Sequence, residues 1–579
     1  MRFASLAVVG LTACVTLGAC SHHGSEEQDE TAAGSALQTH ADMGALRFRD
    51  IFATYLRADG RSQDEIQKLV YLPTDTVLDE SVPMGASPEE TLANLDRRMA
   101  GQRPSTQYAH GVNTPVEPIA DVDAAFAASG PVTIVMIPGI FGEFIDNMPF
   151  QEVFNNDQSF ATREWAEKSA AATGDDANDT MFSLDALDDV EHPMGELMKV
   201  ASIDGADGKP LVRLVFPKPS TGSLETFGTL DKNSEVYVRR LSKYFHVMGG
   251  APEKFYLLGY SRGTPVALDL AVRARAAAEA QDWSGHLAGV LTLGGVLYGS
   301  PLADVARDES QVSGRLIARL RRLGDEIEDC SADNAFVRTA KVTANTGRWL
   351  AAGTELGWIY RQTPSHQEIK WEGIDSSLPE SGRFGEMLKH IIFRDALRLD
   401  HPASDYCGNV TRFKVLLHEV LAGVNTLLTG DRLQWWRTHT IPADMKLFAI
   451  TGTMGDVSRS QNAVWPLTTN TTAYNPGSID FKSLRQNYYD LYAAGGTELN
   501  DSQVPVSRGR FWVDLMRQQN PAQAAPQTYY LGLVGTHHWG FAFPEATATR
   551  NVGVNPFPRA TLLKSLARFI AEAQARGAR

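Results

Sequence analysis

The sequence predicts an α/β fold, a mostly parallel sheet with helices on both faces, from three observations. Apolar runs at residues 131–138, 254–258 and 289–296 contain no polar alternation, as is typical of strands buried on both faces of a parallel sheet. An alanine-rich segment with apolar residues at a helical spacing begins at Thr264. Residues 259–263 join the second run to this segment, so a buried strand leads through a tight turn into a helix.

Other segments extend this pattern. Residues 89–98 are helix-like, and residues 223–248 form a helical stretch that leads into the strand at 254–258. Residues 199–204 and 209–216 are joined by the turn Gly-Ala-Asp-Gly, which predicts a hairpin.

Length, composition and charge limit the possible functions. The 579 residues are enough for more than one domain or for one large α/β domain with insertions. The hydrophobic fraction of 43% and the charged fraction of 21% are ordinary for a globular protein with a full core. The net charge of -15 argues against nucleic acid as a partner, because that role needs lysine and arginine to neutralise phosphates. It also argues against docking on an anionic membrane through a basic patch.

The N-terminus predicts export and a lipid anchor. Arg2 and the apolar residues 3–15 have the charged and hydrophobic parts of a secretory signal, and the run is too short to span a bilayer. Residues 17–20, Leu-Gly-Ala-Cys, resemble the lipobox of bacterial lipoproteins, which implies that Cys20 carries the lipid. Ser21 resembles the residue found in lipoproteins sorted to an outer membrane. The resemblance implies a lipoprotein of the bacterial cell envelope, on the periplasmic side or the cell surface; an ordinary secretory signal is the alternative.

Cys14 leaves with the signal, so Cys330 and Cys407 are the free thiols of the mature chain. Export makes a disulfide between them plausible. Two buried, unpaired cysteines fit the sequence as well, because sequence alone does not place them within bonding distance.

The turn at residues 259–263, Gly-Tyr-Ser-Arg-Gly, matches the G-x-S-x-G nucleophile elbow. On such a turn Ser261 is held in a strained backbone conformation that exposes its hydroxyl above the sheet, and only glycine fits two residues to either side. A serine hydroxyl is a poor nucleophile near neutral pH, so it needs a histidine to take its proton and a carboxylate to orient that histidine. In this fold class the order along the chain is serine, acid, histidine.

Residues 139–142, Gly-Ile-Phe-Gly, follow the strand at 131–138 directly. In α/β-hydrolases the loop after this strand supplies one oxyanion-hole N–H, and the residue after the nucleophile supplies the other. Ile140 and Arg262 are the expected donors, with a purely structural glycine turn as the alternative. The Arg262 side chain could attract an anionic head group, or it could be held by a buried carboxylate.

A family resemblance is carried by residues 291–304, LTLGGVLYGSPLAD. This run is similar to the segment after the sixth strand of bacterial true lipases and related lecithin:cholesterol acyltransferase-like lipases. Their Thr-Pro-His turn is replaced here by residues 295–297, Gly-Val-Leu. The resemblance implies an α/β-hydrolase fold and hydrolysis of carboxylic esters, above all of lipids, through an acyl-enzyme. An acyltransferase, a peptidase or amidase, and a non-catalytic lipid-binding lipoprotein are the alternatives.

Residues 529–534 predict the last strand, and the loop after it contains His537 and His538. The resembled lipases place their histidine a few residues after a glycine and before an apolar stretch. This position favours His538 as the catalytic base and leaves His537 as the alternate.

Two aspartates compete to be the acid. Asp456 follows the strand at 446–450, a usual position for this residue in the fold class. Asp501 lies in residues 499–506, which resemble the acid turn of these lipases: an aspartate, a small residue and then Val-Pro. We favour Asp501, with Asp456 as the alternate.

Helical segments at 313–327, 384–399 and 412–428 predict a cap inserted between the sixth and seventh strands. The apolar faces of the cap, with Trp435 and Trp436, could line an acyl pocket or simply pack on one another. The predicted organisation is a signal peptide at 1–19, a tether at 20–44, an N-terminal extension at 45–129, a core at 130–304 and 445–579, and a helical cap at 305–444.

Neither a metal nor another cofactor is predicted. Some bacterial lipases bind calcium through an aspartate two residues after the histidine, and this position is Gly540 here. His418 and Glu419 begin like a zinc-protease motif, but Ala422 stands where the second histidine would be. The expected partners are a lipid or small ester and a membrane, not nucleic acid, and the sequence leaves the oligomeric state open.

Overall fold

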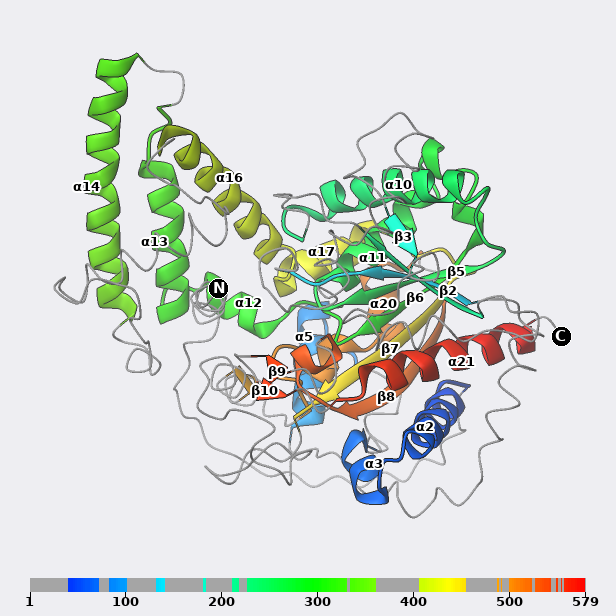
Figure 1. Ribbon diagram of the computed structural model, residues 1–579. Coiled ribbons are helices and arrows are strands. Elements are labelled where there is room, and N and C mark those ends of the chain that lie inside the picture. Colours follow the sequence, from blue (N-terminus) through cyan, green and yellow to red (C-terminus); the bar gives the residue numbers. More distant parts are fainter. Residues whose placement is uncertain are drawn as a thin grey trace.

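The structure is a computed structural model (Figure 1). It describes residues 40–71, 83–100, 132–140, 181–183, 211–217, 226–330, 334–360, 406–454, 487–488, 491, 499–522, 526–542, 548–549, 553–554 and 557–577. The strands of the main sheet are β1 (Val70–Tyr71), β2 (Val132–Ile137), β3 (Met181–Ser183), β4 (Val212–Pro217), β5 (Phe255–Tyr260), β6 (Leu287–Leu293), β7 (Lys446–Thr453) and β8 (Gln527–Gly535). A two-stranded sheet pairs β9 (Ala548–Thr549) with β10 (Gly553–Val554).

The helices are α2 (His40–Ala58), α3 (Gln63–Leu69), α5 (Pro88–Met99), α10 (Leu230–Val247), α11 (Gly263–Ala274), α12 (Pro301–Arg307), α13 (Val312–Glu326), α14 (Ala335–Tyr360), α16 (Tyr406–Asn425), α17 (Thr429–Thr438), α19 (Val506–Gly509), α20 (Val513–Gln519) and α21 (Arg559–Gly577). Short 3₁₀ turns lie at η5 (Ala278–Ala280), η6 (Ser284–His286) and η9 (His538–Phe541). None of the helices in the described ranges is long and apolar enough to cross a membrane.

The main sheet has the order β1-β8-β7-β6-β5-β2-β4-β3. The six strands β8, β7, β6, β5, β2 and β4, in sheet order, all pair in parallel. The edge strands β1 and β3 pair antiparallel with β8 and β4. The runs expected to form doubly buried strands are β2, β5 and β6, and every residue of β2 and β5 is buried. The predicted α/β fold class with a mostly parallel sheet is confirmed.

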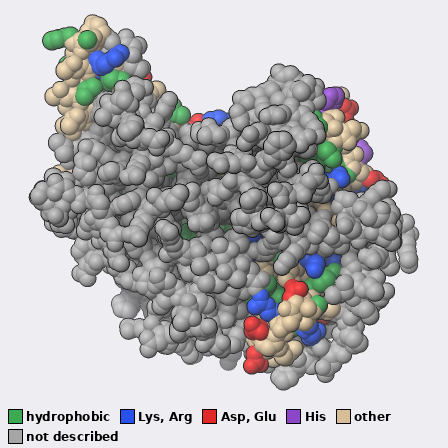
Figure 2. Space-filling model, viewed as in Figure 1, with side chains coloured by type: hydrophobic (Ala, Val, Ile, Leu, Met, Phe, Trp, Pro, Cys, Tyr) green, Lys and Arg blue, Asp and Glu red, His purple; other side chains and the backbone are tan. Residues whose placement is uncertain are grey.

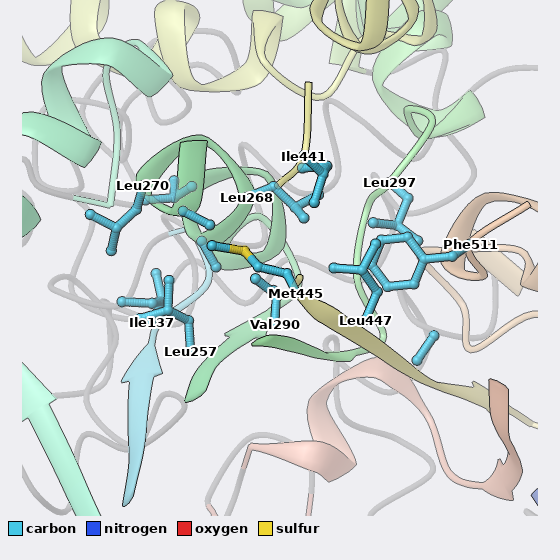
Figure 3. Packing of buried hydrophobic residues seen from close by; sticks show 14 of the residues in the cluster. Ile137, Leu257, Leu268, Leu270, Val290, Leu297, Ile441, Met445, Leu447 and Phe511 are labelled. Atoms are coloured by element: carbon cyan, nitrogen blue, oxygen red, sulfur yellow. The ribbon is translucent and has the colours of Figure 1, made fainter. Parts of the chain in front are cut away.

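Side chains of each strand alternate between two hydrophobic layers. In β2, Ile134 and Met136 join the layer built with α2 and α21, whereas Val135 and Ile137 join the layer built with α10 and α11. Figure 3 shows part of the second layer, in which Leu268 of α11 packs near strand residues of the sheet. Both faces of the sheet are therefore covered, which is why the strands lack polar alternation.

The N-terminal part of the chain contributes to the sheet. Strand β1 pairs antiparallel with β8, and α2 packs on β8 and α21. Helix α2 begins at His40, inside the stretch 20–44 that was expected to be a tether. Residues of the segment 45–129, which had no assigned role, thus form one edge of the core.

The predicted hairpin is only partly described. Its second strand, at 209–216, is β4. The antiparallel neighbour of β4 is β3, which the sequence analysis did not predict. The other predicted strand, at 199–204, lies outside the described residues.

The cap lies between β6 and β7 as predicted, and α13, α14 and α16 project from the body of the molecule (Figure 1). A disulfide joins Cys330, after α13, to Cys407, in the first turn of α16. The sequence had left this pairing open. The predicted helix at 384–399 lies outside the described residues. Phe336 is 85% exposed near the start of α14. Figure 2 shows hydrophobic and basic side chains at the projecting tip of the molecule.

Candidate active site

The turn between β5 and α11 has the geometry expected of a nucleophile elbow. Ser261 has a φ of 53°, a left-handed value that a non-glycine residue rarely adopts. A Cβ at Gly259 would lie 2.5 Å from the Cα of Thr264, and one at Gly263 would lie 2.2 Å from the carbonyl oxygen of Ile137. The two glycines are therefore required by the close approach of backbone, as the sequence predicted.

Hydrogen bonds fix Ser261 to the neighbouring strand, and its side chain is buried. Its backbone N–H donates to the carbonyl oxygen of Leu293 at 3.1 Å. The loop after β2 lies against the serine, because a Cβ at Gly139 would be 3.1 Å from the Cβ of Ser261. Ile140 follows in this loop, so the expected oxyanion segment and the serine are adjacent.

Asp501 and His538 form a buried pair at the ends of neighbouring segments. The distance between His538 Nδ1 and Asp501 Oδ2 is 2.8 Å. The other carboxylate oxygen, Oδ1, accepts hydrogen bonds from the backbone N–H groups of Gln503 at 3.0 Å and Val504 at 2.7 Å. The backbone N–H of His538 donates to the carbonyl oxygen of Asp501 at 2.7 Å. Because a carboxylate only accepts, His538 Nδ1 carries the proton and Nε2 is the basic nitrogen.

The pair and the serine meet at the C-terminal ends of the parallel strands. Gly294 follows Leu293, the hydrogen-bond partner of Ser261, and has a φ of +53°. A Cβ at Gly294 would lie 2.8 Å from Asp501 Oδ2 and 3.1 Å from His538 Nδ1. His538 Nε2 is buried and forms no hydrogen bond within the described part of the chain. The arrangement leaves a basic nitrogen available beside the elbow.

Tyr260 ties the elbow to the histidine, a role that the sequence analysis missed. Its hydroxyl donates to the carbonyl oxygen of His538 at 2.9 Å, and the two ring centroids are 5.1 Å apart. Burial, and secondarily the charge of Asp501, raise the pKa of Tyr260 well above its ordinary value. The hydroxyl therefore stays protonated and keeps its role as a donor. The sequence feature that could have indicated this contact is the position of Tyr260 directly before Ser261.

His537, the alternate base, has a structural contact. Its Nδ1 accepts a hydrogen bond from the backbone N–H of Gly540 at 2.9 Å, which caps the turn η9. Burial, and to a lesser extent the charge of His538, lower the pKa of His537 to about 3. His537 is thus a neutral capping residue, and the structure joins Asp501 to His538. The alternate acid, Asp456, lies outside the described residues.

Arg262 is buried, and the contacts described for its side chain are with neutral groups. Its guanidinium donates to five oxygens of described residues, and all five belong to carbonyl, amide or hydroxyl groups: Thr226 O, Gly228 O, Asn233 Oδ1, Gly423 O and Thr426 Oγ1. The expectation of a carboxylate partner finds no support among these contacts. A guanidinium enclosed in this way does not face an anionic head group.

Trp435 and Trp436 pack in the core instead of lining an acyl pocket. Trp435 Nε1 donates to Asp269 Oδ1 at 2.8 Å, and Trp436 Nε1 donates to the carbonyl oxygen of Leu297 at 3.0 Å. These contacts favour the packing interpretation of the two tryptophans.

A cavity of about 720 Å³ lies elsewhere in the cap, between α12, α13 and α16. Its lining combines apolar side chains such as Ile317 and Leu421 with charged ones such as Lys414 and Glu419. His418, considered above for a metal site, lies in this wall. Within the described residues no group of three or more histidine, cysteine, aspartate or glutamate side chains is placed to hold a metal ion.

Comparisons with known proteins are weak. No family model and no curated protein matches the sequence. The chain is similar in structure to the metagenomic carboxyl esterase MGS0156, with 13% identity, a TM-score of 0.37, and coverage of 93% of this chain and 97% of that one. It is also similar to the mature form of the Bacillus licheniformis lipase BlEst2, with 13% identity, a TM-score of 0.28, and coverage of 71% and 86%. Likenesses of this size carry no inference about activity, so function rests on the site geometry.

Proposed function

We propose that this protein is a serine hydrolase that cleaves carboxylic esters, with lipid esters as its substrates. The observation that carries the proposal is the 2.8 Å contact between His538 Nδ1 and Asp501 Oδ2 beside a serine in left-handed conformation on a glycine-flanked turn. In this arrangement Ser261 is the nucleophile, His538 is the base, and Asp501 orients the base.

In the proposed reaction, His538 Nε2 takes the proton of Ser261 Oγ while this oxygen attacks the ester carbonyl carbon. The backbone N–H groups of Ile140 and Arg262 stabilise the negative oxygen that forms. When the ester C–O bond breaks, His538 gives the proton to the leaving alcohol and the acyl group stays on Ser261. Water then attacks the acyl-enzyme by the same route, which releases the acid and restores the serine.

Two features support lipid esters as substrates. Cap helix α16 approaches the residue next to the nucleophile, as its hydrogen bonds with Arg262 indicate. A cap in this position is suited to enclosing an acyl chain. The lipobox-like residues 17–20 support a location at a membrane, where such substrates are found.

The test is the hydrolysis of p-nitrophenyl esters, from acetyl to palmitoyl, by the full chain in detergent. We expect turnover that rises with chain length and is lost in Ser261→Ala. Asp501→Asn should lower kcat by about 10⁴-fold, because the histidine would take the wrong tautomer. Asp444→Asn, a surface aspartate that is paired with Arg275, is the matched control and should retain activity.

Other results of this assay would change the proposal in specific ways. Activity restricted to short esters would leave the serine hydrolase standing and reject lipid esters. Formation of a new ester when an alcohol is added, in place of free acid, would indicate an acyltransferase. Equal rates for the natural chain and Ser261→Ala would contradict the proposal.

A further inference from the structure

The side chain of Arg262 lies between two segments that are distant from it in sequence. On one side, Nη1 donates to the carbonyl oxygen of Thr226 at 2.7 Å, and Nη2 donates to the carbonyl oxygen of Gly228 at 2.6 Å and to Asn233 Oδ1 at 3.0 Å. These three acceptors belong to the segment that leads into α10 and to its first turn. The guanidinium thus holds the elbow to the start of α10.

On the other side, Arg262 contacts the C-terminal end of cap helix α16. Its Nε donates to Thr426 Oγ1 at 3.0 Å and to the carbonyl oxygen of Gly423 at 3.3 Å. Thr426 Oγ1 in turn donates to the carbonyl oxygen of Gly423 at 2.6 Å, which fixes the hydroxyl that Arg262 meets. The position before the serine therefore contacts the histidine, and the position after it contacts the cap.

These contacts are specific to arginine. The side chain is 1% exposed, and burying a guanidinium costs several kcal/mol unless its donors are satisfied. Its planar fork lets Nε and both terminal nitrogens donate in fixed directions, which a lysine ammonium does not reproduce. A satisfied buried network of this kind holds its members in one arrangement.

Cap helix α16 also has contacts with the α10 segment that do not involve Arg262. The backbone N–H of Gly228 donates to the carbonyl oxygen of Glu419 at 2.9 Å, and Lys232 Nζ lies 2.6 Å from Glu419 Oε1. The cap therefore keeps this attachment if Arg262 is replaced. What Arg262 adds is the connection to the elbow itself.

We propose that the Arg262 side chain is a positioning group: it holds the backbone N–H of Arg262 in place and so couples the cap to the oxyanion hole. The inference rests on the proposed function, in which the backbone N–H of Arg262 is an oxyanion donor. Oxyanion donors act at 2.7–3.1 Å, so a small displacement of this amide weakens them. By clamping the side chain of the same residue, the segment before α10 and the end of α16 set where that amide points.

The experiment measures the second-order rate at which a fluorophosphonate labels Ser261, together with kcat and KM for p-nitrophenyl butyrate. Arg262→Met should lower the labelling rate and kcat by about 10- to 100-fold with little change in KM, since the loss lies in the transition state. Arg262→Lys should restore part of the rate. Thr426→Val removes one hydrogen-bond acceptor of Arg262 on the cap side and should lower kcat by about 3-fold or more.

Thr411→Val is the matched control, because Thr411 lies on α16, the helix that ends just before Thr426, and donates to the carbonyl oxygen of Cys407, away from the elbow. It should keep the natural labelling rate. A double-mutant cycle of Arg262→Met with Thr426→Val should be non-additive.

The inference is overturned if folded Arg262→Met is labelled at the natural rate, even if its melting temperature falls. If Arg262→Met does not fold, equal rates for Thr426→Val and Thr411→Val overturn it. These failures differ from failure of the proposed function, in which the natural chain itself would neither be labelled nor hydrolyse the ester.

Discussion

Tyr260, the residue before the serine, contacts the histidine that we propose as the base. Its ring lies against His538, and its hydroxyl donates to the carbonyl oxygen of that residue. Tyr260→Phe keeps the ring and removes the hydrogen bond, so we expect kcat to fall by about 2- to 10-fold, the effect of one hydrogen bond. Tyr529→Phe, whose hydroxyl bonds to Gln527, is the control and should keep the natural kcat. Equal kcat values for both variants would contradict this role.

His537 links the site to stability in acid. An unfolded histidine titrates near pH 6.5, whereas burial lowers the pKa of His537 to about 3 in the folded chain. Between these values the unfolded chain binds a proton that the folded chain does not, so stability is present above pH 6.5 and is lost as the pH falls. We expect a loss of about 1.4 kcal/mol per pH unit from this residue.

The measurement is the free energy of unfolding from urea titrations at pH 7 and pH 5. His537→Asn should flatten the pH dependence, because asparagine can accept the same capping hydrogen bond without titrating in this range. His246→Gln, at an exposed histidine of α10, removes a histidine elsewhere and serves as the control. Parallel pH profiles for the natural chain and His537→Asn would refute the assignment.

At the scale of elements, the disulfide between Cys330 and Cys407 closes a long stretch of the cap. The two residues are 77 apart in sequence, and a cross-link over a loop of that length contributes about 4.5 kcal/mol in the chain-entropy account. We expect Cys330→Ser with Cys407→Ser to lower the melting temperature measured by circular dichroism. A reductant should lower that of the natural chain and leave the double variant unchanged. A natural melting temperature that is insensitive to reductant would argue against the bond.

The sequence alone did not assign β1 and α3 a place in the fold, because their local patterns are weak. Strand β1 has only two residues, Val70–Tyr71, which is too short to show a periodic pattern. It becomes a strand because the edge of β8 offers unpaired backbone groups. The capping box at Ser62 and Glu65 marks the start of α3 locally, but nothing local indicates that this segment lies against the last strand.

At the scale of the whole molecule, the net charge of -15 leaves the N-terminus as the proposed means of attachment to a membrane. If Cys20 carries lipid, Cys20→Ser should move the protein from the membrane fraction to the soluble fraction on cell fractionation. The physical reason is that each buried methylene of an acyl chain contributes about 0.8 kcal/mol. A Cys20→Ser protein that stays with membranes would exclude the lipid anchor.

The strands, the elbow and the cap could be predicted because their signals are local. Unbroken apolar runs mark strands covered on both faces, and β2, β5 and β6 appear where such runs occur. A Cβ at Gly259 would meet Thr264, just after the turn, and one at Gly263 would meet Ile137 of the neighbouring strand β2. The five-residue pattern around Ser261 therefore reflects both contacts.

The sequence by itself therefore determined the fold class and the proposed nucleophile, whereas the tertiary structure decided the partners of each side chain. His537 and His538 are neighbours in the chain. The position of Asp501 beside the end of β8 gives His538 a carboxylate partner, whereas His537 caps the turn η9. Arg262 meets Gly423 and Thr426 more than 160 residues away, a contact created by the return of the cap onto the elbow. Such pairings depend on the sheet and the cap bringing distant segments together, and the side chains concerned carry no local pattern that reveals it.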